Sequence, residues 1–176
     1  VVGSGNATSE MRLVMIDIAD AAATVHPKVI PTLFVDELSE ELTGDDDYIV
    51  DELGGFTELV IKRIHEDGME VSTTKSMVSA SHPALGEAME EKLKSRNIAY
   101  ALRVKSLGVG LAAGVARNTK VQKTRLKHFS KRLPRFRALR KAGIGTARIV
   151  RTGGVAALMH GFGGMGVAPT MLLHQR

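Results

Sequence analysis

Two adjacent carboxylates, Asp36 and Glu37, directly follow an apolar run at residues 33–35. Neighbouring residues of a strand point to opposite faces, so one cation can bind both carboxylates only where the chain turns tightly at this pair. At about 4 Å the two charges repel by roughly 4 kcal/mol at an effective dielectric constant near 20, and a divalent cation removes that penalty. Turns are also often acidic for reasons of solvation alone. The pair therefore predicts either a hairpin turn facing water or a metal site.

The charges of the chain are divided between its two halves. Residues 1–91 hold all 19 acidic residues and 5 Lys or Arg, a net charge of −14, whereas residues 92–176 hold the other 19 Lys or Arg and no acid. A half with this excess of positive charge cannot neutralise itself. Its partner is either the acidic half of the chain or an external polyanion, and nucleic acid is the commonest external polyanion.

The composition bounds the class of protein. With 176 residues, of which 44% are hydrophobic and 24% charged, the chain is long enough for one globular domain with or without an appendage. The absence of cysteine excludes disulfides, thiolate nucleophiles and cysteine zinc sites, and suits a reducing compartment. The N-terminal residues have no basic segment followed by an apolar core and no initiator methionine, so we expect an intracellular fragment or processed chain, nuclear or cytoplasmic.

Apolar spacing predicts the elements of the acidic half. We expect a helix over residues 10–24 capped by Ser9, a buried strand over 29–35 and a returning strand over 38–42. Three successive aspartates at 45–47 suit the start of a second helix, which Gly68 would end. Short strands over 69–72 and 76–80, a helix around residues 85–93 and a strand over 98–105 follow.

The basic half is predicted to be helical. A helix begins near Arg117, and Pro134 is expected to interrupt it. Residues 152–173 carry no formal charge over about one bilayer thickness, but six glycines, His160 and Pro169 favour paired small-residue helices over a membrane span. The element order predicts an α+β fold. A short mixed or antiparallel sheet with a hairpin packed on helices would occupy residues 1–111, and an α-helical region residues 112–176.

Several short motifs resemble, in order, those of reverse transcriptases. Phe34-Val35-Asp36-Glu37 resembles the active-site hairpin of the palm, where an aromatic, any residue and two aspartates occupy the turn. Residues 68–76 are similar to the glycine-to-lysine segment that follows it, and residues 105–109 to the leucine-glycine turn that grips the primer. Residues 157–161 resemble the thumb-side helix of non-LTR retrotransposon enzymes. The resemblance implies a partial palm followed by a thumb-like region.

The resemblance also implies roles for individual residues. Asp36 and Glu37 would bind catalytic Mg²⁺, or Mn²⁺, Lys75 would approach the triphosphate or protonate the departing pyrophosphate, and Leu107 and Gly108 would hold the primer end. RNA template, DNA primer and deoxynucleoside triphosphates would be the partners of the complete enzyme. Basic side chains would contact template and primer phosphates, namely Lys105, Arg117, Lys120, Lys123, Arg125, Lys127, Lys131, Arg132 and Arg135.

The chain departs from the family pattern at two places. Glu37 stands where the family has a second aspartate, and its extra methylene moves the carboxylate outward. Asp17 lies only 19 positions before Asp36, too close to be the aspartate of the earlier palm strand, and we expect it at the end of the first helix. We therefore expect a C-terminal fragment that does not polymerise alone. The alternative is a non-catalytic nucleic-acid-binding module derived from such an enzyme.

Overall fold

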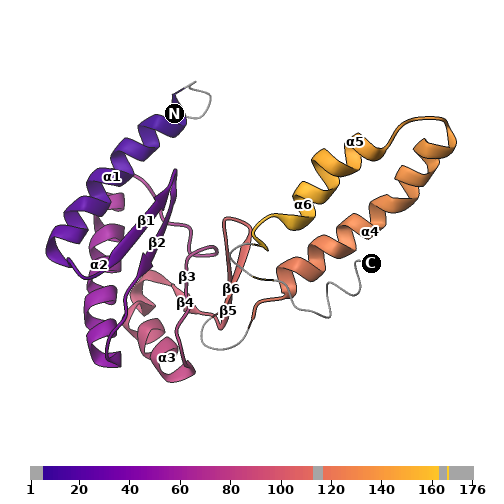
Figure 1. Cartoon of the computed structure of the whole chain (residues 1–176). Helices are drawn as coiled ribbons and strands as arrows, with labels where there is room; N and C mark the ends of the chain where they lie inside the picture. Colours follow the sequence, from indigo (N-terminus) through magenta and orange to yellow (C-terminus); the bar gives the residue numbers. More distant parts are fainter. Residues whose placement is uncertain (1–5, 113–116, 163–165, 167–176) are drawn as a thin grey trace. The chain divides into compact units, whose positions relative to one another are not determined.

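The computed structural model describes residues 6–112, 117–162 and 166, which fall into two compact units, Val1–Ala101 and Leu102–Arg176 (Figure 1). The sequence-based division lies after residue 111, whereas the structure groups the hairpin at residues 103–112 with the helical unit. Each unit is described separately below.

The first unit begins with two helices that enclose a hairpin's inner face. Helix α1 (Ala7–Val25), strands β1 (Ile30–Phe34) and β2 (Glu37–Glu41) and helix α2 (Asp46–Glu66) follow in order (Figure 1). The two strands are antiparallel, and the pairing runs from Ile30 opposite Glu41 to Phe34 opposite Glu37. Apolar side chains of α1 and α2, together with Val29 just before β1, form the core beneath them: Met15, Ile18, Ala22, Phe56, Val60 and Ile64.

The ends of these helices follow local sequence signals. Asp45 is the N-cap of α2, with two further aspartates in its first turn, as predicted from the helix dipole. Gly68 has φ +73°, and the N–H groups of Gly68 and Met69 donate to the carbonyls of His65 and Ile64, which closes α2 in a Schellman motif. The predicted cap Ser9 is wrong, because α1 extends further and begins after Asn6.

The rest of the first unit packs around a second core cluster, which includes Leu85, Met89 and Leu93. Strand β3 (Met77–Val78) pairs in parallel with β4 (Ala99–Tyr100), and helix α3 (Pro83–Lys92) and the 3₁₀ turn η1 (Lys94–Arg96) lie between them in the chain. The predicted strand over 69–72 is wrong: the Ser72 carbonyl accepts from the N–H groups of Lys75 and Ser76, which makes a turn. The predicted strand over 98–105 breaks after Tyr100.

The second unit consists of a hairpin and helices. Strands β5 (Arg103–Ser106) and β6 (Val109–Ala112) are antiparallel, and helix α4 (Lys120–Lys141) follows. A shorter helical stretch is formed by α5 (Ala147–Ile149), the π-helical η2 (Val150–Val155) and α6 (Ala156–Met159). The predicted interruption at Pro134 is wrong, because α4 continues through this residue. Most of the uncharged segment after residue 162 lies outside the described residues.

The α+β class is confirmed, but the predicted single sheet is wrong. In the part of the chain that the structure describes, the strands form three separate two-stranded sheets: β1–β2, β3–β4 and β5–β6. The strands of the middle pair have only two residues each, too few to join the others into one sheet. Within the same residues no helix combines the length and apolarity needed to cross a membrane.

Candidate functional site

The predicted acidic turn is present, one residue earlier than expected. Phe34 pairs with Glu37, so Val35 and Asp36 alone form the connection between β1 and β2. Asp36 is exposed in this turn, whereas Glu37 is already the first residue of β2. Val35 has φ 61°, a conformation that a β-branched residue adopts at a cost on the order of 1–3 kcal/mol.

The two faces of the β1–β2 hairpin have different chemistry. Leu33 and Leu38 face the first core cluster. Ile30 and Phe34 lie on the other face and are 63% and 58% exposed, so the prediction of a buried strand is wrong. Since strand residues alternate, Glu37 lies on this outer face beside Phe34. The turn thus displays Asp36 at its tip and Glu37 on one side.

Glu40 lies on the inner face of the same hairpin. Its carboxylate accepts a hydrogen bond from the hydroxyl of Thr57 on α2. Burial raises the pKa of Glu40 to about 7, and the Thr57 hydrogen bond opposes this shift in part. Residue type alone does not separate Glu40 from the neighbouring acids; only the register of the hairpin distinguishes it from the exposed Glu41.

Lys75 is exposed in the turn at residues 73–75. Asp17 is exposed in the middle of α1, so the prediction that it lies at the end of this helix is wrong. Of the described residues, Asp36 and Lys75 form no ion pair with each other. No group of three His, Asp or Glu side chains within residues 6–112, 117–162 and 166 is arranged to hold a metal ion. Magnesium sites on phosphate substrates often use only one or two protein carboxylates, and Asp36 and Glu37 supply donors of that kind.

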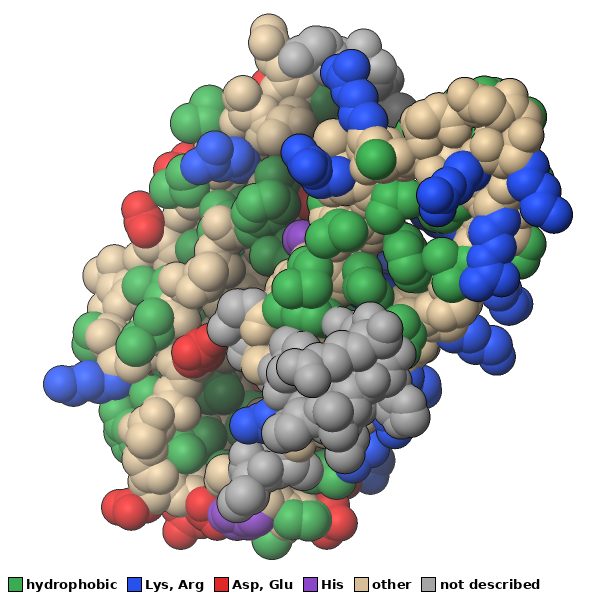
Figure 2. Space-filling view, turned by 45° about the vertical axis from the view of Figure 1, so that its right-hand side comes forward, with side chains coloured by type: hydrophobic (Ala, Val, Ile, Leu, Met, Phe, Trp, Pro, Cys, Tyr) green, Lys and Arg blue, Asp and Glu red, His purple; other side chains and the backbone are tan. Residues whose placement is uncertain are grey.

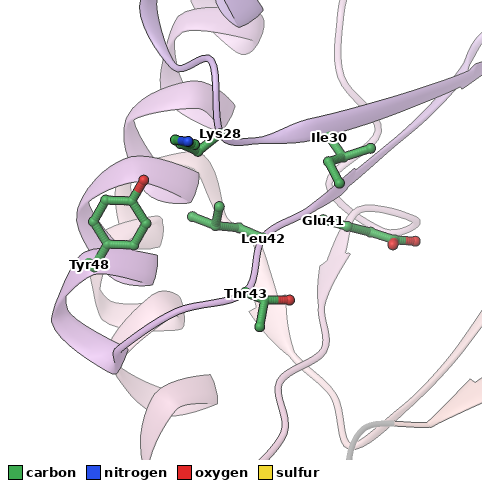
Figure 3. A pocket seen from close by; sticks show the side chains of 6 residues that line it. All are labelled: Lys28, Ile30, Glu41, Leu42, Thr43 and Tyr48. Atoms are coloured by element: carbon green, nitrogen blue, oxygen red, sulfur yellow. The ribbon is translucent and has the colours of Figure 1, made fainter.

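A shallow surface hollow lies at the opposite end of the hairpin from Asp36. Figure 3 shows its side chains, which come from the segment before β1, the ends of both strands, the loop after β2 and the start of α2: Lys28, Ile30, Glu41, Leu42, Thr43 and Tyr48. The ladder between this end and the turn is five residues long, about 15 Å. The hollow is therefore separate from the acidic turn.

The predicted leucine-glycine turn joins β5 and β6 in the second unit. Leu107 and Gly108 have φ values of 47° and 78°, the pair of positive angles typical of a type I′ hairpin turn. The Leu107 side chain is 44% exposed. Below the turn, the buried Asn118 amide donates to the carbonyls of Val104 and Leu111, 2.8 and 3.2 Å away, and so ties both strands to the start of α4.

Two side chains from distant parts of the second unit hold this turn. The Arg125 guanidinium donates to the Gly108 carbonyl at 2.5 Å and to the His160 carbonyl. His160 Nε2 lies 3.1 Å from the Leu107 carbonyl oxygen, and because a carbonyl only accepts, Nε2 carries the proton. The sequence did not indicate His160 as a residue of this site, and it predicted Arg125 as a phosphate contact. The turn residues that Arg125 and His160 contact lie 17 and 53 residues away in the chain, so no local pattern reveals these contacts.

Helix α4 carries most of the predicted phosphate contacts. It contains ten Lys or Arg and no acid, and nine of the ten cations are exposed, Arg125 being half-buried. A stripe at helical spacing is half-buried on one side: Leu126, Phe129, Leu133, Phe136 and Leu139. Figure 2 shows Lys and Arg side chains gathered over the helical unit and most acidic ones over the other. A shallow hollow on α4 is lined by Thr119, Lys120, Lys123, Thr124 and Lys127.

The predicted residues are thus divided between the units. Asp36, Glu37 and Lys75 belong to the first, whereas Leu107, Gly108 and the predicted phosphate contacts belong to the second. Within the second unit, the structure brings the turn and α4 together through Arg125. No protein-family model, curated protein or solved structure matches this chain.

Proposed function

We propose that the second unit binds the phosphate backbone of a polynucleotide through the exposed surface of α4. The observation that carries the proposal is the helix itself, with ten cations and no acid in 22 residues. Cations packed at this density repel one another, and a polyanion removes the repulsion while releasing its own counterions.

The arrangement of the cations suits an extended polyanion. A helix of 22 residues is about 33 Å long. By helical spacing, Lys120, Lys127 and Lys131 lie on the side opposite the half-buried apolar stripe. None of the exposed cations of α4 can be neutralised within the helix, because it has no acid. The surface thus offers positive charge along its length rather than at one point.

The proposal includes descent from a reverse transcriptase of the non-LTR type. Its support is the order of the motifs along the chain, together with the tight hairpin turns at Val35–Asp36 and Leu107–Gly108. In the complete enzyme, Asp36 and Glu37 would hold Mg²⁺ or Mn²⁺, which stabilises charge during nucleotidyl transfer to a primer 3′ end. Lys75 would neutralise phosphate charge, and the Leu107–Gly108 turn would hold the primer.

The phosphate-binding proposal is tested by the salt dependence of binding. For a 20-base-pair RNA–DNA duplex, the logarithm of the association constant should fall linearly with that of the salt concentration. Replacement of Lys120, Lys127 and Lys131 by Gln should reduce the slope by about 3 and weaken binding at least tenfold at about 0.1 M salt.

A matched variant controls for net charge. Lys28, Lys62 and Lys94, all in the first unit, are replaced by Gln, which removes the same three charges. The slope of this control should stay close to that of the unaltered chain. Equal losses in both variants, or no binding by the unaltered chain, would contradict the proposal.

A second candidate function is polynucleotide binding without any chemistry. The observation that favours it is the place of Glu37, which lies on the strand and outer face rather than in the turn with Asp36. Electron paramagnetic resonance of Mn²⁺ in the presence of a deoxynucleoside triphosphate separates the two. If Asp36→Ala leaves the bound Mn²⁺ signal unchanged while the α4 variant loses duplex binding, the binding module is correct.

A further inference from the structure

The turn between β5 and β6 is held from outside the hairpin by Arg125 and His160. Arg125, on α4, donates to the Gly108 carbonyl at 2.5 Å. His160, directly after α6, donates from Nε2 to the Leu107 carbonyl at 3.1 Å. Arg125 also donates to the His160 carbonyl, so the two side chains and the turn form one hydrogen-bonded group.

The space beside the turn is filled by these two side chains. A Cβ atom at Gly108 would lie 2.9 Å from Arg125 Nη2 and 3.4 Å from His160 Nε2. Leu107, in contrast, is a non-glycine residue at positive φ, a conformation that surrounding contacts must maintain. The hydrogen bonds to both carbonyls supply such contacts.

Arg125 also differs from the other cations of α4. It is the only half-buried Lys or Arg among the ten of this helix. Both of its terminal nitrogens donate to backbone carbonyls. Each terminal nitrogen of Arg125 therefore has one hydrogen bond to the protein.

We propose that Arg125 and His160 are positioning residues of the nucleic-acid interface: they fix the Leu107–Gly108 turn so that the exposed Leu107 side chain contacts the polynucleotide bound by α4. This inference rests on the proposed function. It assigns Arg125 to the support of the turn, whereas Lys123, two residues before it on α4 and exposed, contacts phosphate.

The test compares Arg125→Ala with Lys123→Ala in the full chain, using the same 20-base-pair RNA–DNA duplex. Arg125→Ala should weaken binding about tenfold with an unchanged salt slope, because no phosphate contact is lost. Lys123→Ala should reduce the slope by about 1. In ¹H–¹⁵N spectra, the Gly108 amide resonance should shift in Arg125→Ala and stay in place in Lys123→Ala.

His160 provides a rescue experiment. Gln keeps an N–H donor that can reach a carbonyl, so His160→Gln should bind the duplex within about twofold of the unaltered chain, whereas His160→Ala should resemble Arg125→Ala. Leu107→Ala should weaken binding without moving the salt slope. Leu107 is an exposed turn residue and His160 directly follows α6, so these variants also serve if Arg125→Ala does not fold.

The results separate this inference from the proposed function. If the unaltered chain binds the duplex but Arg125→Ala lowers the slope by about 1 and leaves the Gly108 resonance in place, Arg125 is a phosphate contact and the inference is wrong. Unchanged binding by Leu107→Ala and His160→Ala would also overturn it. If the unaltered chain does not bind at all, the proposed function itself fails.

Discussion

Glu40 shows how one side chain of the acidic hairpin acquires properties that its neighbours lack. Burial raises its pKa to about 7, whereas the ordinary value is 4.5. The folded state therefore holds the proton more tightly than the unfolded state. The stabilisation from this group is fully present below about pH 4.5 and is lost as the pH rises through 7.

The variant Glu40→Gln should remove this pH dependence. Gln has no charge to bury and its amide oxygen can still accept from Thr57, so we expect the free energy of unfolding at pH 8 to rise by about 1–3 kcal/mol. Urea denaturation at pH 5 and pH 8 measures the effect. Glu41→Gln, on the exposed face, is the control. If Glu40→Gln lost as much stability between pH 5 and pH 8 as the unaltered chain does, the prediction would be contradicted.

Gly86 on α3 gives a second prediction for a single residue. A Cβ atom there would lie 2.2 Å from Cε2 of Tyr100 and 2.3 Å from Cδ2, so the ring would have to move. Gly86→Ala should lower the free energy of unfolding by about 1–3 kcal/mol, more than the helix propensity of Ala restores. Urea denaturation compares it with Gly153→Ala, where nothing lies within 4 Å. Equal stability of the two variants would show that the ring moves freely.

Among the elements, α4 is the one whose structure departs most clearly from its local sequence. Pro134 has no N–H to donate to the Ser130 carbonyl, yet the helix runs from Lys120 to Lys141. The half-buried stripe that includes Leu133 and Phe136 flanks the proline, so packing of this stripe holds the helix together across it.

Pro134→Ala should therefore strengthen α4. The new N–H restores one hydrogen bond and removes the ring's steric conflict, so we expect more negative ellipticity at 222 nm and a gain of about 1–3 kcal/mol. Arg135→Ala is the control: it replaces the adjacent exposed residue, and both Arg and Ala are good helix formers. It should change neither the ellipticity nor the stability measurably. A loss of ellipticity in Pro134→Ala would show that the helix needs a bend at this residue.

At the scale of the whole molecule, the two compact units carry opposite charges. The second unit holds 16 Lys or Arg and no acid, whereas the first holds all 19 acids. The predicted catalytic residues Asp36, Glu37 and Lys75 are in the acidic unit. A polynucleotide would therefore be attracted mainly to the second unit.

Primer extension tests the expectation that the chain alone does not polymerise. With an RNA template, a DNA primer and deoxynucleoside triphosphates, we expect no incorporation with either Mg²⁺ or Mn²⁺, because the family takes a further metal-binding aspartate from an earlier palm strand and Asp17 lies in helix α1 instead. Circular dichroism of the same preparation, with a cooperative thermal transition, shows that the protein is folded. Robust incorporation that Asp36→Ala abolishes would refute the expectation.

The sequence by itself determined the features that depend on near neighbours. Apolar spacing predicted α1, α2 and α3, the three aspartates predicted the start of α2, and Gly68 predicted its end. A tight turn beside Asp36 was also predicted, because two strands with a short polar connection form a hairpin. The charge division is likewise a property of the sequence alone.

Only the tertiary structure decided which strands pair, which acid is buried and what Arg125 contacts. β1–β2 and β5–β6 are hairpins of consecutive strands, and only β3–β4 pairs strands separated by a helix, so local patterns indicated hairpins but not that the three pairs stay separate. Glu40 differs from Glu41 only through the hairpin register against α2. Arg125 and His160 reach the Leu107–Gly108 turn from 17 and 53 residues away. Such contacts arise from packing, and no local pattern of residue types encodes them.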